Sequence, residues 1–248
     1  MQIEHAEISL LGDRGENQDR VLVATGDESV LMIVIDGMGG HSDGAKAAEV
    51  ASQTIAKAYS RVSQPLLDPQ GFMHLAIGSA HNNLVVLGGE LSMDARPRAT
   101  CAICLVQDGA AYWAHEGDSR IYPVRGDAAR DRTRDHSHVE LLLRDGVIDE
   151  TEIADHPMRN YVECCLGGDA RLPGMTITGQ KRLNAGDTLL ACTDGLWSGL
   201  DDERIARIGN GEDGLAKSLR ELGEDAVRSC GPYADNTSAI ALRMLDPS

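Results

Sequence analysis

The sequence contains, at residues 30–40, the run Val30-Leu31-Met32-Ile33-Val34-Ile35-Asp36-Gly37-Met38-Gly39-Gly40. Its first six residues are apolar and mostly branched, which is typical of a β-strand that is covered on both faces. We expect the strand to end at Asp36, because the glycine-rich residues that follow favour neither a strand nor a helix. Ser42 or Asp43 can then cap a helix from about 44 to 61, where apolar residues recur at helical spacing.

Further strand-like and helical segments surround this run on both sides. We expect strands at 3–9, 21–24, 100–106, 110–115, 119–124, 176–178, 188–193 and 238–245. We expect further helices at 70–87, 137–144, 202–208 and 213–230. Asp108-Gly109 stands between two of the strands and is a strong signal of a β-hairpin. The pattern predicts an α+β fold in which two antiparallel sheets pack together and the helices lie outside them.

Composition limits the possible functions. The 248 residues, 42% of them hydrophobic, favour one large domain with a substantial core. The formal net charge of -16 repels phosphate backbones, so we expect no nucleic-acid partner. We also expect no membrane insertion, because no run of 18 apolar residues occurs. The first residues lack the features of a signal peptide, which favours the cytoplasm. The six cysteines are therefore expected to be reduced thiols, mostly in the core, rather than zinc or redox groups.

Five aspartates stand where the expected strands begin or end: Asp19, Asp36, Asp118, Asp194 and Asp235. Carboxylates that converge on one rim of a sheet repel one another unless cations lie among them. Carboxylate oxygens without His or Cys nearby suit Mg²⁺ or Mn²⁺. The glycines after two of these aspartates remove side-chain bulk, so an ion could also reach the carbonyl of Gly37. Taken singly, however, each aspartate can equally cap a turn.

The order of the motifs resembles that of the metal-dependent Ser/Thr protein phosphatases, the PPM or type 2C family. The resemblance covers residues 7 to 245, and the compact length is similar to the bacterial branch. Its motifs are Arg14-x-x-Asn17-Gln18-Asp19, Asp36-Gly37-Met38-Gly39-Gly40-His41, Gly117-Asp118-Ser119-Arg120, Thr193-Asp194-Gly195-Leu196 and Asp235-Asn236-Thr237-Ser238. The segments His156-Pro157-Met158-Arg159-Asn160 and Leu166-Gly167-Gly168 add to it. The resemblance implies a single domain over 1–248, a β-sandwich in four αββα layers, with a flap at about 137–168.

The resemblance also implies how metal ions would be held. Asp36 would bridge two Mn²⁺ or Mg²⁺ ions, of which one also binds the carbonyl of Gly37. Asp194 and Asp235 would bind the other ion, and Asp19 would hold metal-bound waters. Asp118 would share a third, weaker ion with Asp194, unless it only anchors the turn before the next strand.

The same resemblance implies roles in substrate binding and proton transfer. Arg14 would bind the phosphoryl oxygens, because a guanidinium matches them geometrically and keeps its charge; the alternative is a surface salt bridge. The eukaryotic general acid is replaced here by Met38. His41 would act instead as the general acid or would cap the following helix, and a metal-bound water is the other possible acid. His156 and Arg159 lie in the flap and would contribute to substrate binding.

The implied function is that of a Mg²⁺- or Mn²⁺-dependent protein serine/threonine phosphatase. It would hydrolyse phosphoserine and phosphothreonine by attack of a metal-bridging water, and would reverse a cellular Ser/Thr kinase in signal transduction. One alternative is a catalytically inactive, phosphatase-like binding module. Such a module would be free to lose Asp36, Asp194 or Asp235, and all three are present. Another alternative is a phosphatase of small phosphorylated metabolites.

Overall fold

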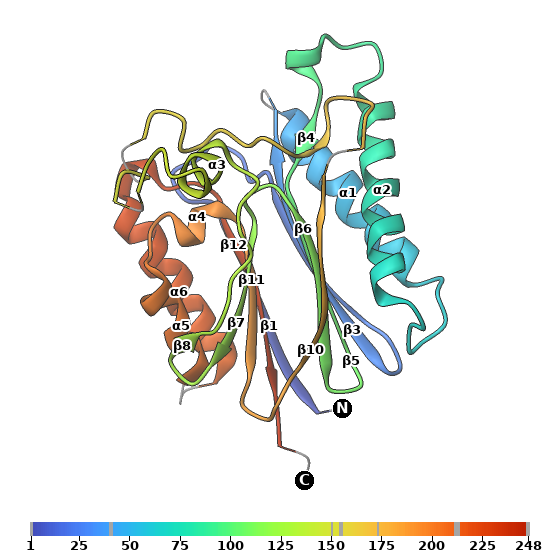
Figure 1. Cartoon of the computed structure of the whole chain (residues 1–248), viewed down its shortest axis with the longest axis vertical. Helices are drawn as coiled ribbons and strands as arrows, with labels where there is room; N and C mark the ends of the chain where they lie inside the picture. The colour runs from blue at the N-terminus through green and yellow to red at the C-terminus, as the bar shows by residue number, and fades with distance from the viewer. Residues whose placement is uncertain are drawn as a thin grey trace.

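Two antiparallel β-sheets packed face to face form the centre of the molecule, and helices cover their outer faces (Figure 1). The computed structural model describes residues 2–39, 42–149, 151–153, 156–172, 174–210 and 214–246. The first sheet contains, in spatial order, β1 (Ile3–Leu10), β12 (Thr237–Met244), β11 (Thr188–Cys192), β7 (Arg120–Arg125) and β8 (Ala128–Ala129). The second contains β10 (Thr176–Arg182), β6 (Ala110–Glu116), β5 (Cys101–Gln107), β3 (Ser29–Met38), β4 (Arg98–Ala99) and β9 (Leu166–Gly167), with β2 (Asp19–Thr25) paired to β3.

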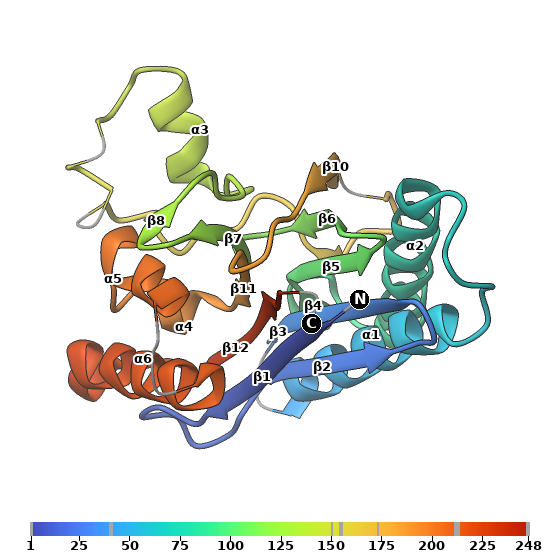
Figure 2. The ribbon, with the colours of Figure 1, turned by 90° about the horizontal axis from the view of Figure 1, so that it is seen from below.

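The helices form two separate outer layers (Figures 1 and 2). One layer covers the second sheet and contains α1 (Ser42–Tyr59) and α2 (Pro69–Gly88). The other covers the first sheet and contains α4 (Asp194–Trp197), α5 (Asp202–Ala206) and α6 (Leu215–Cys230). The remaining helix is α3 (His138–Arg144), and short 3₁₀ turns occupy Met93–Ala95, Arg207–Asn210 and Gly231–Tyr233. The predicted α+β sandwich of four αββα layers is confirmed.

Strand β3 shows why this sequence forms a layered structure. Met32 and Val34 point into the core between the two sheets. Leu31 and Ile33 point the other way, into the core beneath α1 and α2. Successive side chains of a strand alternate between faces, so a continuous apolar run fills both cores. The prediction that this strand is covered on both faces is therefore confirmed.

The predicted hairpin at Asp108-Gly109 is present. Gln107 of β5 pairs with Ala110 of β6, which leaves two residues in the turn. Asp108 has φ 50° and Gly109 has φ 67°. Positive φ at both central positions matches the twist of the flanking strands, and Asp-Gly tolerates it at low cost.

Several predicted boundaries are wrong for identifiable reasons. Strand β10 runs to Arg182 rather than stopping at Thr178, because a bulge between Thr178 and Lys181 interrupts the apolar alternation at this sheet edge. The helix expected over 202–208 ends at Ala206 and continues as a 3₁₀ turn. Asp194 follows β11 as expected, but the short helix α4 that begins at Asp194 was not predicted.

The segment expected to form a flap leaves the body of the molecule at a closed base. Ser137 and Val162 form an antiparallel bridge. The main-chain N–H of His138 donates to the carbonyl of Tyr161 at 2.9 Å, and that of Glu163 donates to the carbonyl of His136 at 2.8 Å. Helix α3 begins the excursion, near the predicted helix at 137–144, and Ser137 is its N-cap. Figure 2 shows α3 projecting beyond β7 and β8.

Candidate active site

Strand pairing places the first two aspartates opposite each other. Strand β2 pairs with β3 so that Asp19 faces Asp36. The prediction that the strand ends before Asp36 is wrong: β3 continues through Gly37 and Met38, which pair with β4. The strand continues because β4 supplies backbone partners to the glycine-rich residues, which alone would favour a loop. Asp36 is thus held by two neighbouring strands rather than by a loop.

Two more aspartates come from the other sheet. One residue, Thr193, separates the end of β11 from Asp194 at the start of α4, and one residue, Asn236, separates Asp235 from β12. Strands β11 and β12 are neighbours. Their ends are joined by the main-chain N–H of Thr193, which donates to the carbonyl of Ser238 at 3.0 Å. This pairing brings Asp194 and Asp235 to the same end of the sandwich.

Thr193 also links the two sheets at this end. Its hydroxyl donates to Oδ2 of Asp19 at 2.8 Å and accepts from the main-chain N–H of Ser238 at 3.1 Å. The threonine is buried. The Asp19 carboxylate is therefore oriented by a side chain from the opposite sheet.

Asp118 lies on the connection between β6 and β7, which passes from one sheet to the other. The indole Nε1 of Trp197, in α4, donates to its main-chain carbonyl at 2.9 Å. The guanidinium of Arg120 lies over the Trp197 ring, 3.6 Å from its centre. It also forms a bidentate ion pair with Asp135, in which Nε and Nη2 donate to the two carboxylate oxygens. Because α4 also carries Asp194, these contacts tie Asp118 to Asp194.

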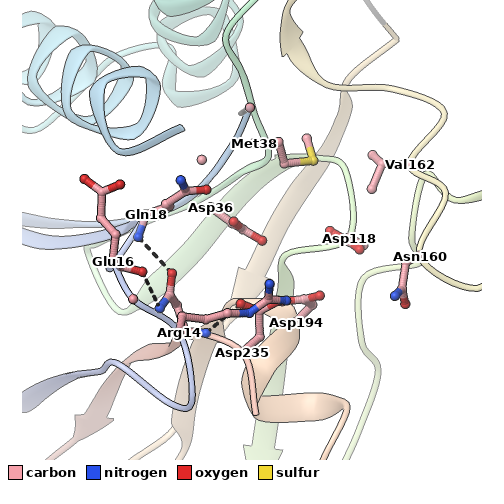
Figure 3. A pocket seen from close by; sticks show the side chains of 14 residues that line it. Arg14, Glu16, Gln18, Asp36, Met38, Asp118, Asn160, Val162, Asp194 and Asp235 are labelled. Atoms are coloured by element: carbon pink, nitrogen blue, oxygen red, sulfur yellow. Dashed lines mark hydrogen bonds and ion pairs between the residues drawn. The ribbon is translucent and has the colours of Figure 1, made fainter. Parts of the chain in front are cut away.

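These aspartates meet in a cavity of about 640 Å³ at the end of the sandwich. Figure 3 shows Asp36, Asp118, Asp194 and Asp235 around one space, with Arg14 across its near side. Asp19 is not among the residues that line the cavity and is buried, with 2% of its surface exposed.

The carboxylates raise one another's pKa. The pKa of Asp36 lies well above its usual value, first because of burial and then because of the charges of four neighbours, which are Asp19, Asp194, Asp118 and Asp235. Burial and the charges of Asp118, Asp235 and Asp19 raise the pKa of Asp194 in the same direction. Burial raises the pKa of Asp19 to about 7, against the hydrogen bonds from Thr193 and Ser238. Burial and Asp135 raise the pKa of Asp118 to about 6.

This donor set fits hard divalent cations. Carboxylates held together at such cost become stable in ionised form once positive charge lies among them. Among the described residues, neither a thiol nor an imidazole lines the cavity, which favours Mg²⁺ or Mn²⁺ over softer metals. In the described part of the chain, no group of three or more His, Cys, Asp or Glu side chains is arranged so that it could hold a metal ion by itself. An open site suits ions that retain several waters.

Gly37 is required for close backbone packing. A Cβ atom at this position would lie 1.9 Å from the carbonyl oxygen of Gly44 and 2.9 Å from that of Gln18. We expected this glycine to leave room for an ion. The structure gives it a further role, because the missing side chain lets the start of α1 approach β3. Gly195 resembles it, because a Cβ there would lie 2.2 Å from the carbonyl oxygen of Asn236.

Arg14 reaches across the cavity to one of the aspartates. Its Nη2 donates to Oδ2 of Asp235 at 2.6 Å, and 56% of its side chain is exposed. Such an exposed pair contributes little to stability, so the guanidinium is available to another anion. Arg14 thus forms the salt bridge that was one expected alternative. Its guanidinium also lies at the mouth of the carboxylate cavity, as phosphate binding, the other alternative, requires.

The other proposed substrate and acid residues are placed differently. His41 lies outside the described residues. His156 and Arg159 are in the flap but do not line the cavity. Nδ1 of His156 instead accepts from the main-chain N–H of Met158 at 3.1 Å. The flap residues that do line the cavity are Asn160 and Val162.

Sequence reasoning missed the residues that hold the site together. Oδ1 of Asn236 accepts from the main-chain N–H of Gln18 at 2.8 Å, and its Nδ2 donates to the carbonyls of Leu11 and Glu16 at 2.9 and 3.0 Å. Asn236 thus fixes the loop that carries Arg14 and Asp19. The signal available in the sequence was an amide residue directly after a site aspartate. The structure shows that this amide is buried, and a buried amide must find hydrogen-bond partners.

The cysteines are free thiols, as expected, and the three in strands β5 and β11 are buried. Burial raises the pKa of Cys104 to about 12, and raises the pKa of Cys101 and Cys192 in the same direction. A thiol with so high a pKa is a poor nucleophile and metal ligand. These residues therefore belong to the core and not to the site.

The family model for protein phosphatase 2C matches residues 12–231. The chain belongs to the protein phosphatase 2C family. The family predicted from the ordered motifs is confirmed, and with it the prediction of a metal-dependent protein phosphatase. The family match begins just before Arg14 and ends just before Asp235.

Curated relatives and solved structures agree with this family. The chain is 31% identical over 246 residues to protein phosphatase PhpP of Streptococcus pneumoniae, covering 96% of this chain and 97% of that protein. A serine/threonine phosphatase structure from S. agalactiae is similar with a TM-score of 0.90 at 26% identity, covering 98% of this chain and 100% of that one. The catalytic domain of serine/threonine protein phosphatase PstP, solved in complex with two manganese ions, is similar with a TM-score of 0.81 at 25% identity, covering 98% and 99%.

Proposed function

We propose that the chain hydrolyses phosphoserine and phosphothreonine in proteins, with two Mn²⁺ or Mg²⁺ ions held by Asp36, Gly37, Asp194 and Asp235. The observation that carries this proposal is the gathering of carboxylates from both sheets in one cavity, where they raise one another's pKa. The two manganese ions of the related PstP structure support the number and kind of ions.

Each residue of the cavity has a distinct role in this proposal. The bound cations would supply charge stabilisation and an activated water for in-line attack on the phosphorus. Arg14 binds the phosphoryl oxygens and leaves Asp235 to do so. Asp19, oriented by Thr193, holds waters at the ions, and Asn236 keeps the loop that carries Arg14 and Asp19 in place.

Asp118 and Asp194 would together hold a third, weaker cation. The contact between Trp197 and the Asp118 carbonyl supports it, because it holds these two aspartates on connected elements. His41 would protonate the leaving alcohol, and bound cations would otherwise supply an acidic water for that role. His156 and Arg159 contact the substrate from the flap, and Asn160 and Val162 shape the cavity entrance.

The proposed setting is that of a bacterial signalling enzyme. The chain forms one phosphatase domain over 1–248, with a flap at about 137–168, and reverses a Ser/Thr kinase in the cytoplasm. No helix in the described ranges is long and apolar enough to cross a membrane.

The test is hydrolysis of a phosphothreonine peptide with EDTA, Mg²⁺ and Mn²⁺ compared side by side. We expect turnover with either metal and none in EDTA. A small phosphorylated metabolite is assayed under the same conditions. Hydrolysis of the metabolite but not of the peptide would contradict the protein substrate. Absence of turnover on both, with metal bound, would indicate an inactive binding module.

A further inference from the structure

A basic groove runs along one side of the sandwich, outside the carboxylate cavity. The two sheets are open on the same side, where β10 ends one sheet and β7 with β8 ends the other (Figure 2). Adjoining cavities of about 390 and 380 Å³ lie there and share Trp113 and Asp131. A third cavity, also of about 390 Å³, adjoins them beneath α3. We call these three cavities together the side groove.

The side groove concentrates positive charge on an acidic protein. Seven cationic side chains line it, whereas the whole chain has a formal net charge of -16. Four of them make no side-chain hydrogen bond or ion pair with any described residue: Arg130, Arg134, Lys181 and Arg182. Arg130 adds only a longer-range attraction to Asp187.

Two carboxylates of the side groove are already neutralised by arginines, and a third accepts a hydrogen bond from a histidine. Asp135 is paired at both oxygens with Arg120, and Asp187 is paired at both oxygens with Arg125. Glu163 is bonded to Nδ1 of His138 at 2.7 Å. Among the described lining residues, Asp131, Glu140 and Glu163 are left to balance the four unpaired cations. The groove therefore attracts anions, while the rest of the acidic surface repels them.

The side groove and the carboxylate cavity share one wall. Asn160 and Val162 of the flap line the cavity, and Glu163 and Cys164, which follow directly, line the groove. His136 lines the groove as well, and its main-chain N–H donates to the carbonyl of Gly117 at 2.8 Å, next to Asp118. A peptide that crosses the base of the flap can therefore occupy both sites at once.

We propose that the side groove binds an acidic, Asp- or Glu-rich segment of the phosphoprotein substrate while the phosphorylated residue occupies the carboxylate cavity. This inference rests on the proposed function and adds the class of substrate to it. Unpaired cations in a concave surface give both charge and shape complementarity for such a segment. The exposed, flexible cations would select acidic sequence without fixing a single motif.

The experiment compares two phosphothreonine peptides of equal length, one with a glutamate tract long enough to extend from the phosphorylated residue along β10 to Lys181 and Arg182, and one with glutamines in place of that tract. Acidic tracts are placed on either side of the phosphothreonine in separate peptides. The enzyme is saturated with Mn²⁺, and kcat/KM is measured for each. We expect a preference of about tenfold for an acidic peptide, which exposed ion pairs can supply. The preference should shrink toward one as salt rises, because exposed charges are screened.

The test variant is Lys181→Glu/Arg182→Glu, and its matched control is Lys57→Glu/Arg61→Glu. Both change the net charge equally, but Lys57 and Arg61 lie at the exposed end of α1 and just beyond it, away from the groove. The test variant should lower the ratio between the two peptides to about one, and the control should retain it. An equal loss of the preference for the acidic peptide in both variants would mean that net charge alone determines it. That result would contradict a binding site in the side groove.

A binding measurement separates this inference from the proposed function. A labelled, unphosphorylated glutamate-rich peptide is titrated in EDTA, where the carboxylate cavity repels it. We expect binding to the wild type and the control variant and about tenfold weaker binding to the test variant. If acidic and neutral phosphopeptides are hydrolysed equally and this peptide does not bind, the side groove is not a binding site for acidic segments. The proposed phosphatase activity would remain supported by that result. If the labelled peptide binds but no phosphopeptide is hydrolysed, the proposed function fails, and a substrate site in the groove fails with it.

Discussion

At the scale of single residues, the account depends on charges that are unfavourable until cations arrive. Asp36 is flanked by four other aspartates that raise its pKa, and it lies between two paired strands. Its carboxyl group has a hydrogen bond with Asp19, but the charges around it are those of anions and oppose its ionisation. Its replacement should therefore separate function from stability.

We expect Asp36→Asn to reduce turnover at least about a thousandfold, because removing a cation ligand removes the charge that stabilises the transition state. The same variant should be more stable than the wild type in EDTA, because one like charge is gone. Phosphopeptide hydrolysis at saturating Mn²⁺ and thermal melting in EDTA measure both effects. Asp68→Asn, at the N-cap of α2, is the control. Near-normal activity of Asp36→Asn would refute the assignment.

For Arg14 we expect the opposite pattern, because its positive charge repels the cations and attracts the substrate phosphate. Arg14→Ala should raise KM and weaken inhibition by inorganic phosphate about tenfold or more. Its Mn²⁺ affinity should not fall, since the change frees Asp235 from its 2.6 Å ion pair. Calorimetric titration with Mn²⁺ and phosphate inhibition assays test this. Weaker Mn²⁺ binding with unchanged phosphate inhibition would show that Arg14 supports the metal site instead.

Replacement of Asp118 should weaken the binding of only the third, most weakly held cation. Asp118→Ala should leave two ions bound and cripple hydrolysis, and it should abolish the late rise in activity at high Mn²⁺. Few protein ligands serve that third position, so it fills last. Activity is followed over a wide range of Mn²⁺ concentrations in both proteins. An unchanged titration would leave Asp118 as a turn residue only.

At the scale of elements, the site depends on how closely α1 and β3 approach. Gly37→Ala would place a methyl group 1.9 Å from the Gly44 carbonyl oxygen, where backbone and not a flexible side chain must move. We expect a loss of about 2–3 kcal/mol in the free energy of unfolding. Activity should also fall, because Asp36 shifts with the strand. Gly179→Ala in β10, with no atom within 4 Å of the added Cβ, is the control for urea unfolding. Equal stability of the two variants would contradict this account of the glycine.

The elements also show what could be predicted from the sequence. The apolar run at 30–35 and the Asp-Gly turn at 108–109 have local causes, and both were predicted correctly. The boundary at Asp36 was wrong, because β4 supplies its backbone partners from sixty residues further on. The pairing of Asp19 with Asp36 depends on strand register, and the flap residues Asn160 and Val162 depend on the path of a loop. Neither has a periodic signal in the sequence.

At the scale of the whole molecule, the carboxylate cluster links stability to pH and to metal. The pKa of Asp19 is raised from 3.8 to about 7, so between these values the folded state holds a proton that the unfolded state has lost. Its contribution to stability therefore falls as pH rises through this window and is constant above it. Without metal, the wild type should lose stability from pH 5 to pH 8 relative to Asp19→Asn, by on the order of 2 kcal/mol.

Cations should reverse this trend, because they bind the ionised carboxylates. At a hundred times its Kd, one bound ion stabilises the folded state by about 2.7 kcal/mol. Thermal melting of both proteins at pH 5 and pH 8, in EDTA and in Mn²⁺, measures the effect. A wild-type Tm that is insensitive to Mn²⁺ at pH 8 would contradict a carboxylate-held metal centre.

The most direct test of the central claim is a crystal of the protein grown with Mn²⁺, with anomalous scattering recorded at the manganese absorption edge. We predict two strong anomalous peaks in the cavity, one beside Asp36 and the Gly37 carbonyl and the other among Asp36, Asp194 and Asp235. A third peak beside Asp118 should appear only at high Mn²⁺. Arg14 should then have left Asp235. Manganese bound elsewhere, or an empty cavity with the Arg14–Asp235 pair intact at saturating Mn²⁺, would contradict the account.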